Sequence, residues 1–158
     1  MTIQPIVLAT ALALLFTANG AQASDPDYIR SPATVKSDLP FSDAVRVGDL
    51  IFLSGKIGSV PGSVKLADGG IEGETRQTMK NIGSTLDLAG SSWQRVVKCT
   101  VFLSDMKDWP AFNAVYKDFF TDNLPARSAV AVKGLARDAK VEVECIAALN
   151  TPVVSSKP

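Results

Sequence analysis

One arginine and two glutamates near the end of the chain are the residues whose types and spacing could do chemistry. Arg127 lies in the segment LPARS, residues 124–128, and Glu142 and Glu144 alternate with apolar residues further on. Alternation along a strand places both glutamates on one face. Carboxylates on so apolar a strand need a partner or a role, since burying an unpaired charge is costly. An arginine near them can bind a small carboxylate substrate through two parallel N–H donors.

Histidine is absent from the whole sequence, which has only two cysteines. Its absence excludes Ser-His-Asp and Cys-His catalysis, and every metal site that needs histidine. Two cysteines alone cannot form a four-cysteine metal site. Any catalysis must therefore come from Arg, Lys, Glu, Asp, Tyr, Ser or the backbone.

The charge balance argues against one class of function. Lys plus Arg and Asp plus Glu are each 16, so the formal net charge is zero. A protein that binds nucleic acid by neutralising phosphates carries an excess of positive charge. The length of 158 residues and the hydrophobic share of 46% instead indicate one compact domain.

The first 23 residues predict an export signal. They carry no charged side chain, contain the apolar run IVLATALALLFT at 6–17, and end in the A-x-A pattern of Ala21 and Ala23. The apolar run is short for a membrane span. We expect cleavage after Ala23 and a periplasmic or secreted protein with no stable membrane association. An uncleaved anchor and a buried N-terminal helix are the alternatives.

Export would place Cys99 and Cys145 in an oxidising compartment. Both lie on the apolar side of expected strands. A disulfide requires those two strands to be adjacent and in register. We favour two free, buried thiols that act as small hydrophobic side chains.

Hydrophobic periodicity predicts an α+β domain with the element order β-β-α-β-α-β-β. Helices are expected at 72–89 and from a cap at Asp108 to 122, and strands at 44–46, 49–54, 95–103, 129–132 and 140–149. Two helices on one face of a mixed sheet make a two-layer sandwich. Residues 24–39 are expected to be a mobile lead-in, 40–150 the folded domain and 151–158 a polar tail. Trp109 is expected only to pack where the second helix starts.

The strand pattern also predicts which side chains share a face of the sheet. The face toward the helices would hold Val97, Cys99, Val101, Val143 and Cys145. The opposite face would hold Lys98, Thr100, Glu142 and Glu144 together with the apolar Phe102 and Ile146. No helix remains to cover this half-apolar face, so we expect it to form a subunit interface.

Residues 40–149 resemble the RidA (YjgF/L-PSP) family of reactive-intermediate deaminases. The strongest pieces are LPARS at 124–128 and VEVECIA at 141–147. Weaker pieces in the same order are VGDLIFLSG at 47–55, VVKCTVFL at 96–103 and FNAVY at 112–116. The resemblance implies a chorismate-mutase-like α+β subunit and a homotrimer with ligand clefts between neighbouring subunits. It also implies hydrolysis of 2-imino or enamine acids, such as 2-iminobutanoate, to 2-oxo acids and ammonia, with no metal or organic cofactor.

The resemblance also implies roles for five residues. Arg127 matches the arginine that binds the substrate carboxylate, and Glu142 matches the acid that handles the water and its proton. Ser54, Gly55 and Asn113 match positions that line the cleft.

Each of these residues also has a structural interpretation. Arg127 could form a surface ion pair, and Glu142 could be the partner of Lys98 or Lys140. Glu144 is expected to be structural. Lys56, next to the cleft positions, is expected to be a solvated loop residue.

Two departures from the family pattern alter the wall of the implied pocket. Phe41 stands where these deaminases usually have tyrosine, and Ala129 stands where they often have cysteine. A non-catalytic periplasmic protein that binds small carboxylates is therefore the alternative function. RNA cleavage, which the old family name implies, is disfavoured by the lack of histidine and of a basic patch.

Overall fold

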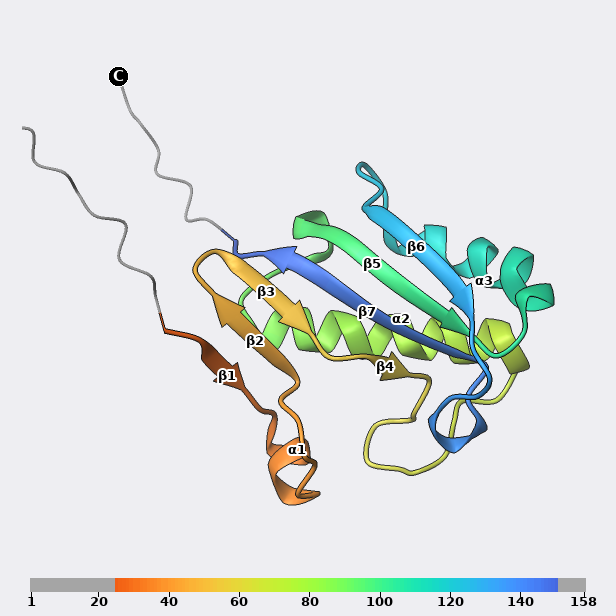
Figure 1. Ribbon diagram of the computed structural model, residues 1–158, viewed down its shortest axis with the longest axis horizontal. Helices are drawn as coiled ribbons and strands as arrows, with labels where there is room; N and C mark the ends of the chain where they lie inside the picture. The colour runs from red at the N-terminus through yellow and green to blue at the C-terminus, as the bar shows by residue number, and fades with distance from the viewer. Residues whose placement is uncertain (1–24, 151–158) are drawn as a thin grey trace, which may run out of the picture.

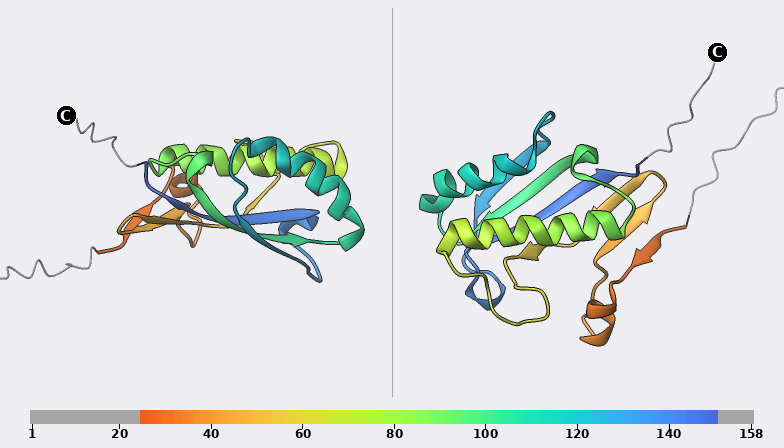
Figure 2. Two further views of the ribbon diagram at one scale, coloured as in Figure 1. Left: turned by 90° about the horizontal axis from the view of Figure 1, so that it is seen from above. Right: turned by 180° about the vertical axis from the view of Figure 1, so that it is seen from behind.

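Alternating apolar residues build one mixed sheet, and two amphipathic helices cover one of its faces (Figures 1 and 2). The computed structural model describes residues 25–150. The strands are β1 (Asp27–Ile29), β2 (Ala44–Val47), β3 (Leu50–Leu53), β4 (Lys56–Ile57), β5 (Val96–Leu103), β6 (Ala126–Ala131) and β7 (Val141–Ala148). The helices are α1 (Pro32–Lys36), α2 (Gly70–Leu88) and α3 (Trp109–Tyr116), and short 3-10 turns lie at Trp93–Arg95, Met106–Asp108, Lys117–Phe119 and Ala136–Asp138.

The strands follow the order β1-β2-β3-β7-β5-β6, and β4 pairs with β7 beyond the end of β3. Within residues 25–150, β5 and β6 are the one parallel pair, and α3 lies in the connection between them. The long antiparallel pair of β5 and β7 forms the centre of the sheet. The expected chorismate-mutase-like α+β fold is confirmed.

The core lies between the sheet and the two long helices. On α2, Met79, Ile82 and Leu86 are buried, as their spacing predicts. Gly90 follows the helix with a φ of 76°, a conformation that favours glycine after a helix end. No helix in the described part of the chain is long and apolar enough to cross a membrane. The expected signal segment 1–23 and the tail 151–158 lie outside the described residues.

The segment expected to be a mobile lead-in, residues 24–39, contains regular structure in its described part. Strand β1 pairs with β2, and α1 begins after Ser31, whose hydroxyl accepts a hydrogen bond from the Thr34 amide. The Asp43 carboxylate, far along the chain, accepts hydrogen bonds from the Ser31 amide at 2.8 Å and the Thr34 hydroxyl at 2.6 Å. The local composition is polar, so only these long-range contacts show that the segment is folded.

The expectation of two free thiols is wrong. Cys99 on β5 and Cys145 on β7 are directly opposite each other and form a disulfide with an S–S distance of 2.01 Å. Both are buried in the core. The alternation of apolar residues predicts the correct face for both cysteines. It cannot predict that their two strands are neighbours, because that depends on the order of strands in the sheet.

Val97 does not lie on the face predicted for it, because strand β5 contains a β-bulge. The register of β5 against β7 shifts between Val96 and Lys98, so Val96 is buried and Val97 is 48% exposed. A bulge adds one residue to a strand and reverses the parity of those before it.

The face of the sheet turned away from α2 and α3 is called here the open face; Figure 1 looks onto it. Its side chains include Leu50, Phe52, Phe102, Val130 and Ile146. Leu50, Phe52 and Val130 are each more than two-fifths exposed in the single chain. Exposed apolar residues gathered on one face are typical of a surface that contacts another protein.

Candidate functional site

Arg127 lies on strand β6, which begins at Ala126 and not at residue 129 as expected. It pairs with Cys99, whose side chain points to the helices, so Arg127 also points to the helix side of the sheet. Its guanidinium carbon lies 4.7 Å from the ring centre of Tyr116, 5.4 Å from that of Trp109 and 5.6 Å from that of Phe112. These rings follow one face of α3, and cation–π attraction to them holds the arginine in place.

The N–H donors of Arg127 are available to a ligand. Among the described residues, no carboxylate lies within ion-pair distance of Arg127. The surface ion pair considered as its structural role is therefore not formed. A guanidinium fixed at its apolar faces, with its N–H edge unpaired, is suited to bind a carboxylate bidentately.

Two polar groups of α3 next to this position also lack partners. The side-chain oxygen of Asn113 and the hydroxyl of Tyr116 are buried without a hydrogen bond in the described structure. Buried polar atoms without partners are costly, so their presence in this part of the fold needs an explanation. Burial raises the pKa of Tyr116 to about 12, although Arg127 opposes this, so the hydroxyl stays protonated and can donate. Arg127, Asn113 and Tyr116 are called here the arginine half-site.

Ser54, Gly55 and Glu142 form a second cluster, called here the glutamate half-site. Glu142 on β7 is opposite Phe102 of β5 and Ile57 of β4, and so points to the open face. Its carboxylate lies against Gly55, where a Cβ atom would overlap a Glu142 oxygen. Only glycine at position 55 leaves room for this carboxylate.

The environment of Glu142 favours proton exchange. Burial raises the pKa of Glu142, and the charge of Glu144 on the same strand raises it further. Among the described residues, neither Lys98 nor Lys140 forms an ion pair with Glu142; Lys140 instead lies 3.8 Å from Asp108. A carboxyl group whose pKa moves toward neutrality is better suited to general acid–base catalysis.

Glu144 occupies a different place from Glu142. It is exposed and lies opposite Thr100 of β5. A shallow pocket on the open face includes it and is lined by Phe52, Leu53, Lys98, Thr100, Glu144, Cys145 and Ile146. Gly55 and Glu142 are not part of that lining, so the geometry separates the two glutamates.

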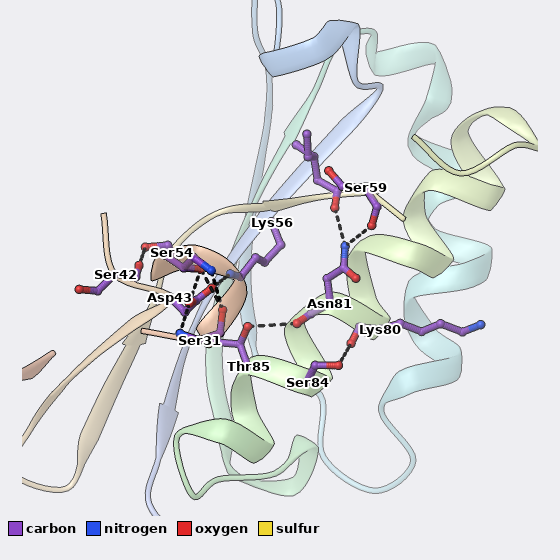
Figure 3. A network of polar contacts seen from close by, with 12 residues as sticks. Ser31, Ser42, Asp43, Ser54, Lys56, Ser59, Lys80, Asn81, Ser84 and Thr85 are labelled. Atoms are coloured by element: carbon purple, nitrogen blue, oxygen red, sulfur yellow. Dashed lines mark hydrogen bonds and ion pairs between the residues drawn. The ribbon is translucent and has the colours of Figure 1, made fainter. Parts of the chain in front are cut away.

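The segment that carries Ser54 and Gly55 is held by residues that sequence reasoning missed. The Ser54 hydroxyl donates to the Ser42 carbonyl at 2.6 Å, and Lys56 Nζ donates to Asp43 Oδ1 at 2.6 Å (Figure 3). Lys56 is therefore not the solvated residue that was expected; its side chain is 16% exposed. Nothing in the local sequence marks Asp43, because its partners come from two separate segments, residues 29–34 and 54–56. The aromatic support of Arg127 was missed as well, although its spacing along α3 could have revealed it.

The sheet separates the two half-sites within one chain. Arg127 lies on the helix side against rings of α3, the helix that also carries Asn113, whereas Gly55 and Glu142 are brought together on the open face next to Ser54. Phe41, 46% exposed, precedes the segment that holds Ser54. The five expected site residues therefore form two groups and not one pocket.

This fold and these residues match one family of known proteins. The family model described as Endoribonuclease L-PSP matches residues 31–149. The chain is 42% identical over 118 residues to the mouse protein named 2-iminobutanoate/2-iminopropanoate deaminase, covering 75% of this chain and 85% of that protein. The chain belongs to the RidA (YjgF/L-PSP) family.

Solved structures agree with this assignment. A Rid-family protein of Yersinia pestis superposes with a TM-score of 0.74 at 32% identity, over 79% of this chain and all of that one. TdcF of Escherichia coli, solved with bound serine, superposes with a TM-score of 0.66 at 33% identity, over 69% of this chain and 87% of that one. The family match begins at residue 31, which includes α1 in the domain.

Proposed function

We propose that this protein hydrolyses 2-imino acids, and their enamine tautomers, to 2-oxo acids and ammonia. Its relatives of known name support an imine deaminase activity. The observation that carries the proposal is the guanidinium of Arg127, which is fixed on three rings of α3 and has no carboxylate partner among the described residues. Such a site fits the carboxylate and the polar carbon–nitrogen group of a small 2-imino acid.

The complete site is proposed to lie in a cleft between two subunits of a homotrimer. Arg127 and Glu142 lie on opposite sides of one sheet, so a single chain cannot present both to one small substrate. The apolar open face that carries Glu142 supports contact with another copy. In a closed ring, the arginine half-site of one copy faces the glutamate half-site of its neighbour.

The proposed reaction needs only water addition and proton transfer. Arg127 binds the carboxylate of the substrate and orients the imine carbon. The substrate reacts as its protonated iminium form. A water molecule adds to that carbon while the Glu142 carboxylate accepts one water proton, which forms a neutral carbinolamine. Glu142 returns this proton to the nitrogen. The carbon–nitrogen bond then breaks while the hydroxyl group gives its proton to Glu142, so that ammonia leaves as the carbonyl forms. Because these steps are proton transfers around one positioned carbon, no metal or organic cofactor is needed.

The proposed location is the periplasm or the exterior of the cell. The support is the apolar run and A-x-A pattern of residues 1–23. N-terminal sequencing of the exported protein should give Ser24 as the first residue. An exported protein that still begins at Met1 would contradict signal cleavage.

The test of the activity is 2-oxo acid formation from freshly generated 2-iminobutanoate. We expect the protein that starts at Ser24 to accelerate the reaction, and Arg127→Ala to lower kcat/KM by about 100-fold. Arg127→Lys should recover little, because an ammonium group cannot bind a carboxylate bidentately. Binding of 2-oxobutanoate without any acceleration would instead support the non-catalytic carboxylate-binding function.

A further inference from the structure

Two short segments are joined around the glutamate half-site by three contacts. The Ser54 amide donates to the Asp43 carbonyl at 3.0 Å, and the Ser54 hydroxyl donates to the Ser42 carbonyl at 2.6 Å. Lys56 Nζ donates to the Asp43 carboxylate at 2.6 Å. Residues 42 and 43 therefore hold the chain on both sides of Gly55 (Figure 3).

Both oxygens of the Asp43 carboxylate accept hydrogen bonds in this arrangement. One oxygen binds Lys56, and the other accepts hydrogen bonds from the Ser31 amide and the Thr34 hydroxyl at the start of α1. Burial opposes the ionisation of Asp43, but these donors outweigh it and hold the pKa of Asp43 well below its ordinary value. A buried carboxylate with three donors has little freedom to move.

The position of Gly55 determines where the Glu142 carboxylate lies. Lys56 and Ile57 of β4 pair with Val143 and Glu142 of β7, so the chain just after Gly55 is in register with the strand that carries the acid. The Glu142 carboxylate lies directly against Gly55. Any shift of Gly55 would therefore change where this carboxylate rests and how far water reaches it.

We propose that the Asp43–Lys56 ion pair is a positioning device for Glu142. It acts through Ser54 and Gly55, which it holds as a rigid support for the Glu142 carboxylate. Lys56 is opposite the buried Val143, so it points to the helix side of the sheet and not toward Glu142. The role in turnover rests on the proposed deaminase function, whereas the effect on the placement of Glu142 does not.

Steady-state kinetics on 2-iminobutanoate tests the role in turnover. Lys56→Met breaks the ion pair, and we expect kcat to fall about tenfold with KM changed by less than about twofold, since a misplaced catalytic group slows the chemical step. Asp43→Asn with Lys56→Gln replaces the ion pair by a neutral hydrogen bond and should recover kcat to within about threefold of wild type. Arg46→Ala removes the exposed Arg46–Asp27 pair and serves as the matched control, with kcat expected to stay as in wild type.

Two kinetic outcomes would overturn the proposal. One is a wild-type kcat in Lys56→Met. The other is a loss that the double variant does not recover although both proteins melt cooperatively, which would assign the loss to general destabilisation.

A titration that needs no turnover tests the placement of Glu142 separately. The groups around this carboxyl are Glu144 on its own strand and the uncharged Phe102 and Ile57 on its neighbours. By carbon-13 NMR, we expect the titration midpoint of Glu142 to fall in Lys56→Met, because the released carboxylate becomes more hydrated, and to return in the double variant. An unchanged midpoint in Lys56→Met overturns the proposal. If the wild type lacks deaminase activity, the proposed function fails. The titration still shows whether the Asp43–Lys56 ion pair positions Glu142.

Discussion

At the scale of single residues, the environment of each charged group distinguishes a candidate site residue from a residue with structural contacts. Arg127 has aromatic support and no carboxylate partner among the described residues, whereas Arg46 forms an exposed ion pair with Asp27. Glu142 is partly buried against Gly55, whereas Glu144, two residues later, is exposed. The same side chain can therefore be assigned a different role from its surroundings alone.

The two glutamates give a matched pair of variants. We expect Glu142→Gln to lower kcat on 2-iminobutanoate by about 100-fold, because an amide cannot accept the proton of the attacking water. Glu144→Gln should keep kcat within about threefold of wild type, since its carboxylate only adds to the charge that raises the pKa of Glu142. Equal losses in both variants, measured by initial rates, would contradict the assignment of Glu142.

The pKa of Glu142 also predicts how the rate depends on pH. The proposed base must be ionised, and burial raises the pKa of its carboxyl group. We expect kcat to fall as the pH is lowered through this raised pKa, at a higher pH than an exposed glutamate would require. In Glu144→Gln the midpoint should move to lower pH, since the neighbouring negative charge is gone. A pH–rate profile of both proteins measures this, and a midpoint that moves to higher pH would count against it.

At the scale of the elements, two cross-links hold the strands that position the site. The Cys99–Cys145 disulfide joins the central strands β5 and β7, and Asp43 joins α1 to the strand ends around Gly55. The disulfide lies beside Arg127, which is the register partner of Cys99 on β6. Both links join segments that are distant in the sequence, and both should contribute to stability.

Removing the disulfide should lower stability without unfolding the protein. For the variant with Cys99→Ala and Cys145→Ala we expect the free energy of unfolding to fall by about 2–4 kcal/mol, because the cross-link restricts the unfolded chain. Urea denaturation without reductant measures the loss, and a reducing agent should lower the stability of the wild type alone. Titration of the denatured, non-reduced wild type should find no free thiol. Two free thiols would show that the bond does not form in the protein.

The Asp43 contacts predict a loss of stability in acid. Because the pKa of Asp43 is held below its ordinary value of 3.8, its contribution is fully present above about pH 4 and is lost as the pH falls toward the folded-state pKa. Asp43→Asn should lower the free energy of unfolding at pH 7 by about 3 kcal/mol, since it leaves Lys56 without its partner. Urea denaturation at several pH values should show the two proteins converging below pH 4. A constant difference at all pH values would contradict this origin.

At the scale of the whole molecule, the two half-sites on opposite sides of the sheet predict that variants can complement each other. Arg127→Ala and Glu142→Gln should each keep only about one-hundredth of the wild-type activity when assayed alone. After the two are unfolded and refolded together, about a quarter of the clefts between subunits should contain both intact half-sites. Activity should therefore return to about that share of wild type in the mixed sample.

Complementation also separates a shared site from a site within one chain. Refolding each variant alone is the control and should give only the low activity of that variant. If the mixture stays as inactive as its components although it forms mixed oligomers, the site does not lie between subunits.

Much of this protein follows from local pattern. The periodicity of the apolar residues predicts α2, α3 and the central strands, because a helix or strand must bury one face to be stable. The alternation of side chains along β7 places Glu142 and Cys145 on opposite faces of the sheet. Short segments such as LPARS identify the family. These properties depend on neighbours in the sequence, so they can be read from it.

Only the tertiary structure decides which distant segments meet. It pairs Cys99 with Cys145, brings Asp43 to Ser31 and Lys56, and moves Val97 to the open face through a bulge. It also places Arg127 and Glu142 on opposite sides of the sheet. The physical reason is that strand order, register and bulges depend on how the whole sheet fits against its helices, and no single segment contains that information.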